Sequence, residues 1–206
     1  MKKDLLSQWV DGKCLPVSSK NKLQLAFSSS NPFPHLELKD FFREDRAKKL
    51  LLALSKEKFI PKEADLFKLK QTNDLASSSV RELQGFRKFL LSEDFMSYME
   101  SITGFTLKRG VIDLAGSLYE DTDYLLCHDD QLEGRKIAFL FYLSSMGKNE
   151  GGSLGLLDTQ LRTVKRIVPR FNTFAFFEVS PHSFHEVEEM LKDRQRITLG
   201  GWFHGR

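Results

Sequence analysis

The sequence predicts a mainly β fold with supporting helices, in the form of a double-stranded β-helix, or jelly roll, braced by N-terminal helices. Two observations carry this prediction. From Phe105 onward, apolar and polar residues alternate with a period of two, which is the side-chain periodicity of strands. The preceding residues instead show helical apolar spacing, and about eight short strands that follow helices favour a double sheet braced on one face.

The segment before these strands is expected to hold an extension and helices. Residues 1–30 are predicted to be an N-terminal extension, and two prolines in the Asn-Pro-Phe-Pro segment after it block helix formation. Asp40 is expected to cap the first helix, Ser79 and Glu82 match a capping box for the second, and Gly104 should end the third. The helices are predicted over residues 40–55, from residue 79 onward, and over residues 93–102, with an irregular stretch at 56–76.

Eight strands are expected in the remaining half of the chain. They are predicted near residues 105–114, 117–127, 136–144, 153–158, 162–168, 172–180, 183–188 and 195–204. Glycines and prolines between them mark the turns. We expect one domain of residues 31–206, in which residues 31–104 form the helical support and residues 105–206 form the jelly roll.

Composition places the chain among ordinary globular proteins. Of its 206 residues, 41% are hydrophobic and 29% are charged, and the net charge of +3 is too small to predict nucleic-acid binding. Two distant cysteines fit a reducing compartment better than a disulfide scaffold. No apolar run approaches the ~20 residues of a membrane span, and no signal peptide is recognised. We therefore expect a cytoplasmic protein, or a nucleocytoplasmic one in a eukaryote, with no membrane partner.

The chemistry is expected at the end of one strand, in the segment Leu125-Leu126-Cys127-His128-Asp129-Asp130. Side chains of a strand alternate between its faces, so His128 and Asp130 should point to the same side. An imidazole nitrogen and a carboxylate oxygen would then converge on one point. They are two members of the 2-His-1-carboxylate set that holds non-haem Fe(II) and leaves other coordination positions open.

The third ligand must come from a distant segment. His185, in the predicted strand at residues 183–188, is the preferred candidate, and His182 is its rival. A single histidine is more often a solvated or hydrogen-bonded side chain than a ligand, and a His-x-Asp pair with a distant histidine also occurs by chance. The metal site therefore depends on the residues expected around it.

Arg196 supports a site for an acidic ligand. Arg196 and Thr198 share one face of the last predicted strand, and a guanidinium beside a hydroxyl suits a carboxylate at the inner end of a pocket. Tyr142 carries the one polar side-chain group of the apolar segment Ile137–Leu143 in a predicted strand, and a buried tyrosine hydroxyl needs a hydrogen-bond partner. Taken alone, Arg196 would more often be a surface arginine and Tyr142 a core tyrosine. When the metal ligands are considered together with these two residues, a role in binding an acidic ligand is favoured for both.

These segments resemble the prolyl-hydroxylase branch of the Fe(II)/2-oxoglutarate dioxygenases, and within it the catalytic domain of the eukaryotic ribosomal prolyl 3-hydroxylases. The resemblance covers roughly residues 31–206 and is most specific over the last 90 or so. The segments that carry it are Leu125–Asp130, Gly134–Phe139, Tyr142–Leu143, Gly151–Leu154, Phe176–Pro181, Ser183–His185 and Gly201–Gly205.

The resemblance implies an enzyme and a set of site residues. His128, Asp130 and His185 would bind Fe(II), and Arg196 would pair with the distal carboxylate of 2-oxoglutarate. The other residues implied at the co-substrate site and pocket are Tyr142, Thr198, Tyr119, Trp202 and Leu125. Molecular oxygen would be consumed, 2-oxoglutarate decarboxylated to succinate, and a prolyl residue of a protein hydroxylated, with ascorbate as a supporting reductant. The resemblance points to a ribosomal protein or translation factor as substrate.

Other interpretations stay open from the sequence alone. The same chemistry could act on a nucleic acid or a small molecule, because Lys165, Arg166 and Arg170 form a basic cluster. A non-catalytic interaction module could also retain the jelly roll, since a fold does not prove an activity. The eukaryotic enzymes carry a second jelly-roll domain after the segment that resembles Gly201–Gly205, whereas this chain ends at Arg206. A single-domain enzyme and a shortened chain are both compatible with the sequence.

Overall fold

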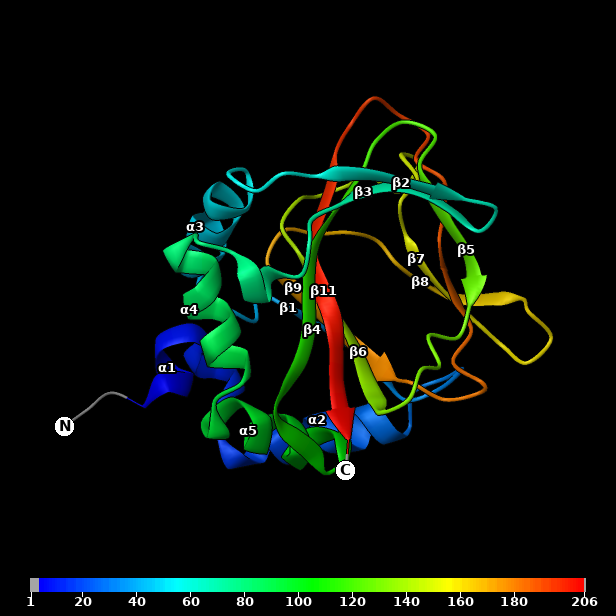
Figure 1. Cartoon of the computed structure of the whole chain (residues 1–206). Helices are drawn as coiled ribbons and strands as arrows, with labels where there is room; N and C mark the ends of the chain where they lie inside the picture. The colour runs from blue at the N-terminus through cyan, green and yellow to red at the C-terminus, as the bar shows by residue number, and fades with distance from the viewer. Residues whose placement is uncertain (1–3, 206) are drawn as a thin grey trace.

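The computed structural model describes residues 4–205 and has a mainly β fold with helices on one side (Figure 1). Its strands are β1 (His35–Lys39), β2 (Ile60–Ala64), β3 (Phe67–Gln71), β4 (Leu107–Tyr119), β5 (Tyr124–His128), β6 (Arg135–Tyr142), β7 (Leu154–Leu157), β8 (Thr163–Ile167), β9 (Thr173–Glu178), β10 (His185–Val187) and β11 (Arg196–Gly205). They form one antiparallel sheet in the order β1-β9-β6-β11-β4-β3-β5-β10-β7-β8, with β2 paired to β3. Strands β4, β6 and β11 lie in the layer beside the helices, and β5, β7 and β8 lie in the opposite layer.

The helices are α1 (Leu5–Trp9), α2 (Val17–Ser28), α3 (Glu44–Leu54), α4 (Arg81–Leu90) and α5 (Glu93–Thr103). The end predicted for α5 is confirmed, because Gly104 takes a left-handed conformation with φ of 77°. Two predicted starts are wrong. Helix α3 begins after Arg43, three residues beyond the start that a cap at Asp40 would give. At the start of α4, Ser78, not Ser79, accepts the hydrogen bond from the Val80 N–H. None of the helices in residues 4–205 combines the length and apolar character that crossing a bilayer requires.

Phenylalanines on one face of the central strands attach the helices to the sheet. Phe139 and Phe141 of β6 and Phe174 of β9 lie in one buried cluster with the helix residues, and the ring of Phe42 is 4.6 Å from that of Phe141. The neighbouring residue Tyr142 points the opposite way, into the space between the layers. The period of two predicted from the sequence thus separates a helix-packed face from an interior face.

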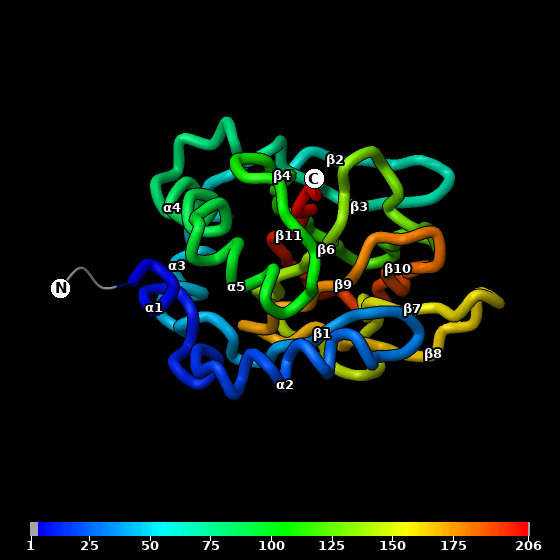
Figure 2. The backbone as a smooth tube through the Cα atoms, turned by 90° about the horizontal axis from the view of Figure 1, so that it is seen from below, coloured from blue at the N-terminus to red at the C-terminus, as the bar shows by residue number. Residues whose placement is uncertain are grey.

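The segment predicted as an N-terminal extension packs into this same core. Leu6, Trp9, Val10 and Phe27 are buried within it. Figure 2 shows α2 running alongside β1, with α1 at one end of the molecule and the β7–β8 hairpin at the other. The first 30 residues therefore help to hold the helical layer against the sheet.

The stretch predicted to be irregular contains the hairpin of β2 and β3. Strand β3 pairs with both β4 and β5 and so joins the two layers, whereas β2 pairs with β3 alone. Four of the five residues of β2 are exposed. An exposed strand lacks the alternation of apolar and polar residues on which strand prediction depends, which explains why this prediction was wrong.

Arg109 of β4 connects that strand to α5 through two carboxylates. Its guanidinium nitrogens lie 2.6 Å from Glu100 and 2.7 Å from Glu93. Hydrogen bonding from Arg109 lowers the pKa of Glu100. Because this pKa is lower in the folded chain, the stabilisation is present above the unfolded value near 4.5 and is lost as the pH falls through the folded value.

We therefore expect Arg109→Gln to lower the free energy of unfolding by about 1 kcal/mol at pH 7, or about 2–4 °C in melting temperature. The difference from the unsubstituted chain should shrink below about pH 4.5. Thermal melts followed by circular dichroism at several pH values measure both effects. Arg43→Gln is the control, because Arg43 and Asp45 are both about half exposed. An equal loss of unfolding free energy in both variants at pH 7 would contradict a stabilising role for the contacts of Arg109 with Glu93 and Glu100.

Candidate metal centre and pocket

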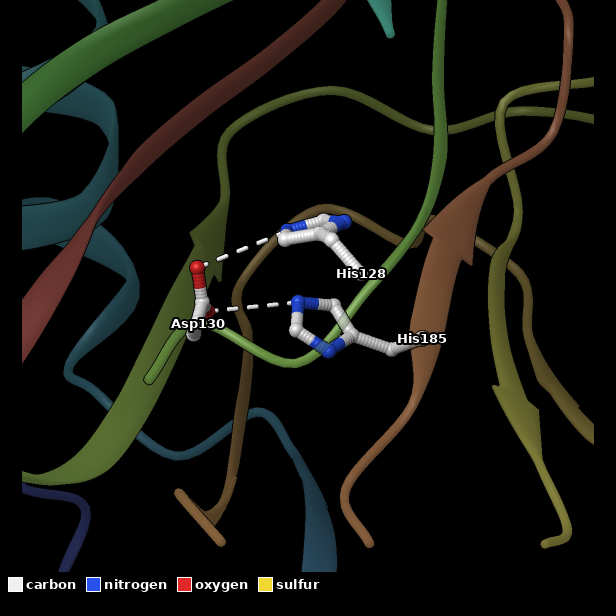
Figure 3. A group of neighbouring side chains, drawn as sticks. All are labelled: His128, Asp130 and His185. Carbon is white, nitrogen blue, oxygen red and sulfur yellow. Dashed lines mark ion pairs between the residues drawn. The ribbon is translucent and has the colours of Figure 1, made fainter. Parts of the chain in front are cut away.

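Three side chains with metal-binding atoms meet between the two layers of the sheet. His128 ends β5, His185 begins β10, and the two residues are partners in the antiparallel ladder. Figure 3 shows both imidazole rings turned toward the Asp130 carboxylate. The Nε2 atom of His128 is 3.4 Å from Asp130 Oδ1, and that of His185 is 3.2 Å from Oδ2. One ligand atom from each residue lies within 4.8 Å of the others, in an arrangement that could hold a metal ion.

The two imidazoles are oriented by the strands that carry them. The Nδ1 atom of His128 lies 2.8 Å from the Leu126 carbonyl oxygen, and that of His185 lies 2.9 Å from the Ser183 carbonyl oxygen. These contacts leave both Nε2 atoms facing the carboxylate. The rival candidate His182 is exposed and lies outside this group.

Asp130 reaches the histidines by a different route from the one predicted. Strand β5 ends at His128, and Asp130 has a left-handed backbone with φ of 60°. The prediction that both residues share one face of a strand was therefore wrong, although the side chains do meet. A left-handed residue is uncommon outside glycine, but aspartate tolerates it better than most.

The electrostatics of the group favour an ionised carboxylate. Burial acts to raise the pKa of Asp130, but hydrogen bonding with His128 and His185 outweighs burial and holds the pKa well below its usual range. For His128, burial acts to lower the pKa, and the interaction with Asp130 reverses this and raises it. At neutral pH the centre therefore presents one negative oxygen donor beside two imidazoles.

A cavity of about 670 Å³ opens beside these three residues, and Arg196 lies at its buried end. The Nε atom of Arg196 donates a hydrogen bond of 2.8 Å to the Gly152 carbonyl oxygen. Gly152 has φ of 70°, and a Cβ there would lie 2.5 Å from the Met190 sulfur, so this close approach needs glycine. The arginine is thus held in place by the backbone, and its side chain forms part of the cavity lining.

Two buried polar atoms at this end have no hydrogen-bond partner among the described residues. They are Nη2 of Arg196 and the hydroxyl oxygen of Tyr142. The guanidinium carbon lies 4.8 Å from the ring centre of Tyr119 and 5.2 Å from that of Tyr142. Burial raises the pKa of Tyr119 to about 12, against the opposing effect of the Arg196 charge. Tyr119 therefore stays a neutral phenol beside a cation.

All the residues predicted for the pocket line this cavity except Tyr142, which lies just behind it. Arg196, Thr198 and Trp202 line it from β11, where they alternate with residues that face the helices, and Leu125 lines it from β5. Cross-strand pairing places Tyr119 opposite Arg196 and Tyr142 opposite Thr198. Tyr119 lines the cavity, and Tyr142 is fully buried against the same arginine.

The sequence profile of the 2OG-Fe(II) oxygenase superfamily matches residues 114–204, the segment that contains all three residues of the candidate metal centre and Arg196. The chain carries a 2OG-Fe(II) oxygenase domain.

Curated relatives of this oxygenase domain are prolyl hydroxylases. The chain is 41% identical over 187 residues to the prolyl 3-hydroxylase OGFOD1 of Xenopus laevis, which covers 85% of this chain and 36% of that protein. It is 34% identical over 196 residues to the prolyl 3,4-dihydroxylase OGFOD1 of Ostreococcus tauri, covering 84% of this chain and 38% of that protein. The chain thus spans little more than a third of the length of these relatives.

Solved structures confirm the jelly roll of the oxygenase domain. A prolyl-4-hydroxylase of Pseudomonas putida superposes with a TM-score of 0.73 at 15% identity, over 89% of this chain and 99% of that one. A prolyl hydroxylase of Trichoplax adhaerens, solved with a peptide of hypoxia inducible factor, gives 0.72 at 14% identity, over 90% of each chain. At such low identity the likeness shows a shared fold.

Two further residues beside the metal centre of the oxygenase domain were not predicted as its neighbours. The indole nitrogen of Trp202 donates a 2.9 Å hydrogen bond to Asp130 Oδ2, and the Arg135 guanidinium carbon lies 3.4 Å from the Trp202 ring centre. Trp202 was predicted as a pocket residue and does line the cavity, where it shares a face of β11 with Arg196 and Thr198. No pattern in the sequence could have indicated its contact with Asp130, because that residue lies in an irregular loop.

Proposed function

We propose that this chain is the catalytic domain of a prolyl hydroxylase, in which His128, Asp130 and His185 hold Fe(II) and Arg196 anchors 2-oxoglutarate. The observation that carries the proposal is the presence, in one cavity, of a converging His-Asp-His group and a buried arginine with an unpaired nitrogen. The similarity to prolyl 3-hydroxylases over most of the chain supports the choice of a prolyl residue as the target.

The residues present fit both bound groups. Two imidazole nitrogens and one carboxylate are the donor set of non-haem Fe(II) sites with open positions. At the other end, a buried cation whose Nη2 has no protein partner suits a carboxylate, and the unpaired Tyr142 hydroxyl can donate to the same group. A dicarboxylic acid reaching from Arg196 toward the histidines would satisfy both atoms.

The protein's part in the reaction is binding, orientation and exclusion of water. When bound, the ferrous ion and 2-oxoglutarate supply the oxidising chemistry, with succinate and carbon dioxide as co-products. Arg196 fixes the far end of the co-substrate, and the neutral phenols of Tyr119 and Tyr142 shield that charge from water. His128, Asp130 and His185 would hold the metal as its three protein ligands. No side chain is required as a general base.

The open side of the cavity is where a polypeptide substrate would enter. Residues of the β2–β3 hairpin and of the loop after β3 line it there, including Lys62, Leu66 and Asn73. The resemblance to ribosomal prolyl 3-hydroxylases makes a ribosomal protein or translation factor the proposed substrate class, in keeping with the cytoplasmic compartment expected from the sequence. Ascorbate would serve to keep the iron ferrous.

The proposal is tested by intact-mass measurement of ribosomal proteins and translation factors incubated with the purified chain, Fe(II), ascorbate and oxygen. We expect one protein to gain a single oxygen atom when 2-oxoglutarate is present and none when it is omitted. Fragmentation should place that oxygen on a proline, and replacing this proline by alanine should abolish the gain. Turnover of non-peptide substrates alone would overturn the prolyl assignment.

A further inference from the structure

The three residues of the candidate metal centre are not held equally firmly by the backbone. His128 and His185 lie on paired strands, and a backbone carbonyl fixes each ring. Asp130 lies beyond the end of β5, in a loop, with a left-handed backbone. Strand pairing therefore does not set the position of the carboxylate, and neighbouring side chains must do so.

Among the residues outside the metal centre, Trp202 hydrogen-bonds to the carboxylate, and Arg135 Nη1 lies 4.0 Å from its Oδ1. The indole N–H of Trp202 donates a 2.9 Å hydrogen bond to Oδ2 of Asp130. Trp202 itself stands on β11, where pairing with β4 on one side and β6 on the other fixes its backbone. This hydrogen bond thus connects Asp130, which lies in a loop, to β11, which is paired with a strand on each side.

Arg135 supports the indole from its open face. The guanidinium carbon lies 3.4 Å from the Trp202 ring centre, and Nη1 lies 3.4 Å from the carbonyl oxygen of Asp130. Asp113 in turn lies 3.5 Å from Arg135 Nε and 3.1 Å from His204 Nε2. The indole is therefore confined between its own strand and a charged side chain that is itself paired.

We propose that Trp202 is a positioning residue that holds Asp130 as a one-oxygen metal ligand. This inference rests on the proposed function, because it takes Asp130 to be a ligand. Oδ2 accepts the indole hydrogen bond and lies 3.2 Å from His185 Nε2, whereas Oδ1 lies 3.4 Å from His128 Nε2 and does not contact the indole. Oδ1 is therefore the oxygen that the indole would leave for the metal. An unrestrained carboxylate can chelate through both oxygens and occupy a position that the co-substrate needs. The indole hydrogen bond opposes that second contact.

The test is Trp202→Phe, which keeps a smaller aromatic ring beside Arg135 and removes the N–H donor. Co(II) alone is the probe, and its dissociation constant and d–d absorption spectrum are measured without co-substrate or protein substrate. Loss of an outer hydrogen bond to a metal ligand typically weakens metal binding by about 10–100-fold. We expect a rise of that size in the dissociation constant, together with a changed spectrum.

Trp9→Phe is the matched control, because Trp9 is the other tryptophan of the chain and is buried in the helical core. It should leave the Co(II) affinity and spectrum unchanged. Melting curves of both variants show whether they are folded. Should Trp202→Phe unfold, Arg135→Met is the second variant. It removes the stacked cation together with its 4.0 Å ion pair to Asp130 Oδ1. We expect a smaller rise in the dissociation constant and a spectrum changed in the same direction.

The outcomes separate this inference from the proposed function. If the unsubstituted chain binds no Co(II), the metal centre itself fails, and the role of Trp202 fails with it. If the unsubstituted chain binds Co(II) and folded Trp202→Phe binds it with the same affinity and spectrum, only the positioning role is overturned. If Trp202→Phe does not fold, the comparison uses Arg135→Met instead. A folded Arg135→Met variant with the Co(II) affinity and spectrum of the unsubstituted chain would likewise overturn the positioning role.

Discussion

His185→Ala should abolish 2-oxoglutarate turnover and weaken metal binding by well over 100-fold. The expected loss exceeds the ~10–100-fold that removal of an outer hydrogen bond costs, because a direct ligand disappears. His185 is 4% exposed and its ring lies 4.1 Å from that of His128, so no other histidine among the described residues can take its place without moving the backbone. Titration with Co(II) and measurement of succinate formation give the two quantities.

His182→Ala is a close control for this substitution. His182 lies three residues away, is exposed, and contributes no atom to the metal centre. We expect its affinity for Co(II) and its turnover to equal those of the unsubstituted chain. Equal losses in the two variants would assign the effect to the segment as a whole, and an active His185→Ala variant would remove this residue from the ligand set.

Arg196→Met should raise the KM for 2-oxoglutarate by over 100-fold while leaving the protein without bound co-substrate at least as stable. Leaving a buried charge unpaired costs about 3 kcal/mol or more, which corresponds to a factor above 100 in binding. In the protein without co-substrate, the same substitution should not destabilise the fold. Arg196 is fully buried and its Nη2 has no partner, so an apolar side chain of similar length removes a desolvated charge.

This prediction combines two measurements that a merely damaged protein would not satisfy together. The melting temperature without 2-oxoglutarate should be unchanged or higher, and the rise in melting temperature on adding 2-oxoglutarate should disappear. Arg162→Met is the control, since Arg162 is exposed and pairs with Asp158 on the surface. A variant that melts lower and retains its response to 2-oxoglutarate would contradict the placing of the co-substrate at Arg196.

The central strands were predictable because burial imposes a strict alternation on them. In β6 the residues facing the helices and those facing the interior alternate from Ile137 to Tyr142, and the predicted strand covers the observed one almost completely. The same parity placed Arg196 and Thr198 together. Where one face meets a core and the other a cavity, the pattern of residue types follows directly from the physics of burial.

Other parts were not predictable because their structure depends on distant partners. The β2–β3 hairpin is mostly exposed on β2 and owes its place to pairing with β4 and β5. Asp130 reaches its position through a left-handed turn, and Trp202 meets it across 72 residues of sequence. Local patterns carry no information on such contacts. The prediction correctly grouped His128 with Asp130, but it wrongly placed both residues in one strand.

The helices cover only one of the two layers, and this asymmetry divides the site. The helix-packed cluster takes its sheet residues from β4, β6, β9 and β11, and Arg196 and Trp202 belong to that half. His128 and His185 belong to the half without this covering, where opening fluctuations should require less free energy. A metal and a dicarboxylate bound between the halves would therefore act as a cross-link. Amide hydrogen exchange in β5 and β10 should slow far more upon loading than exchange in β6.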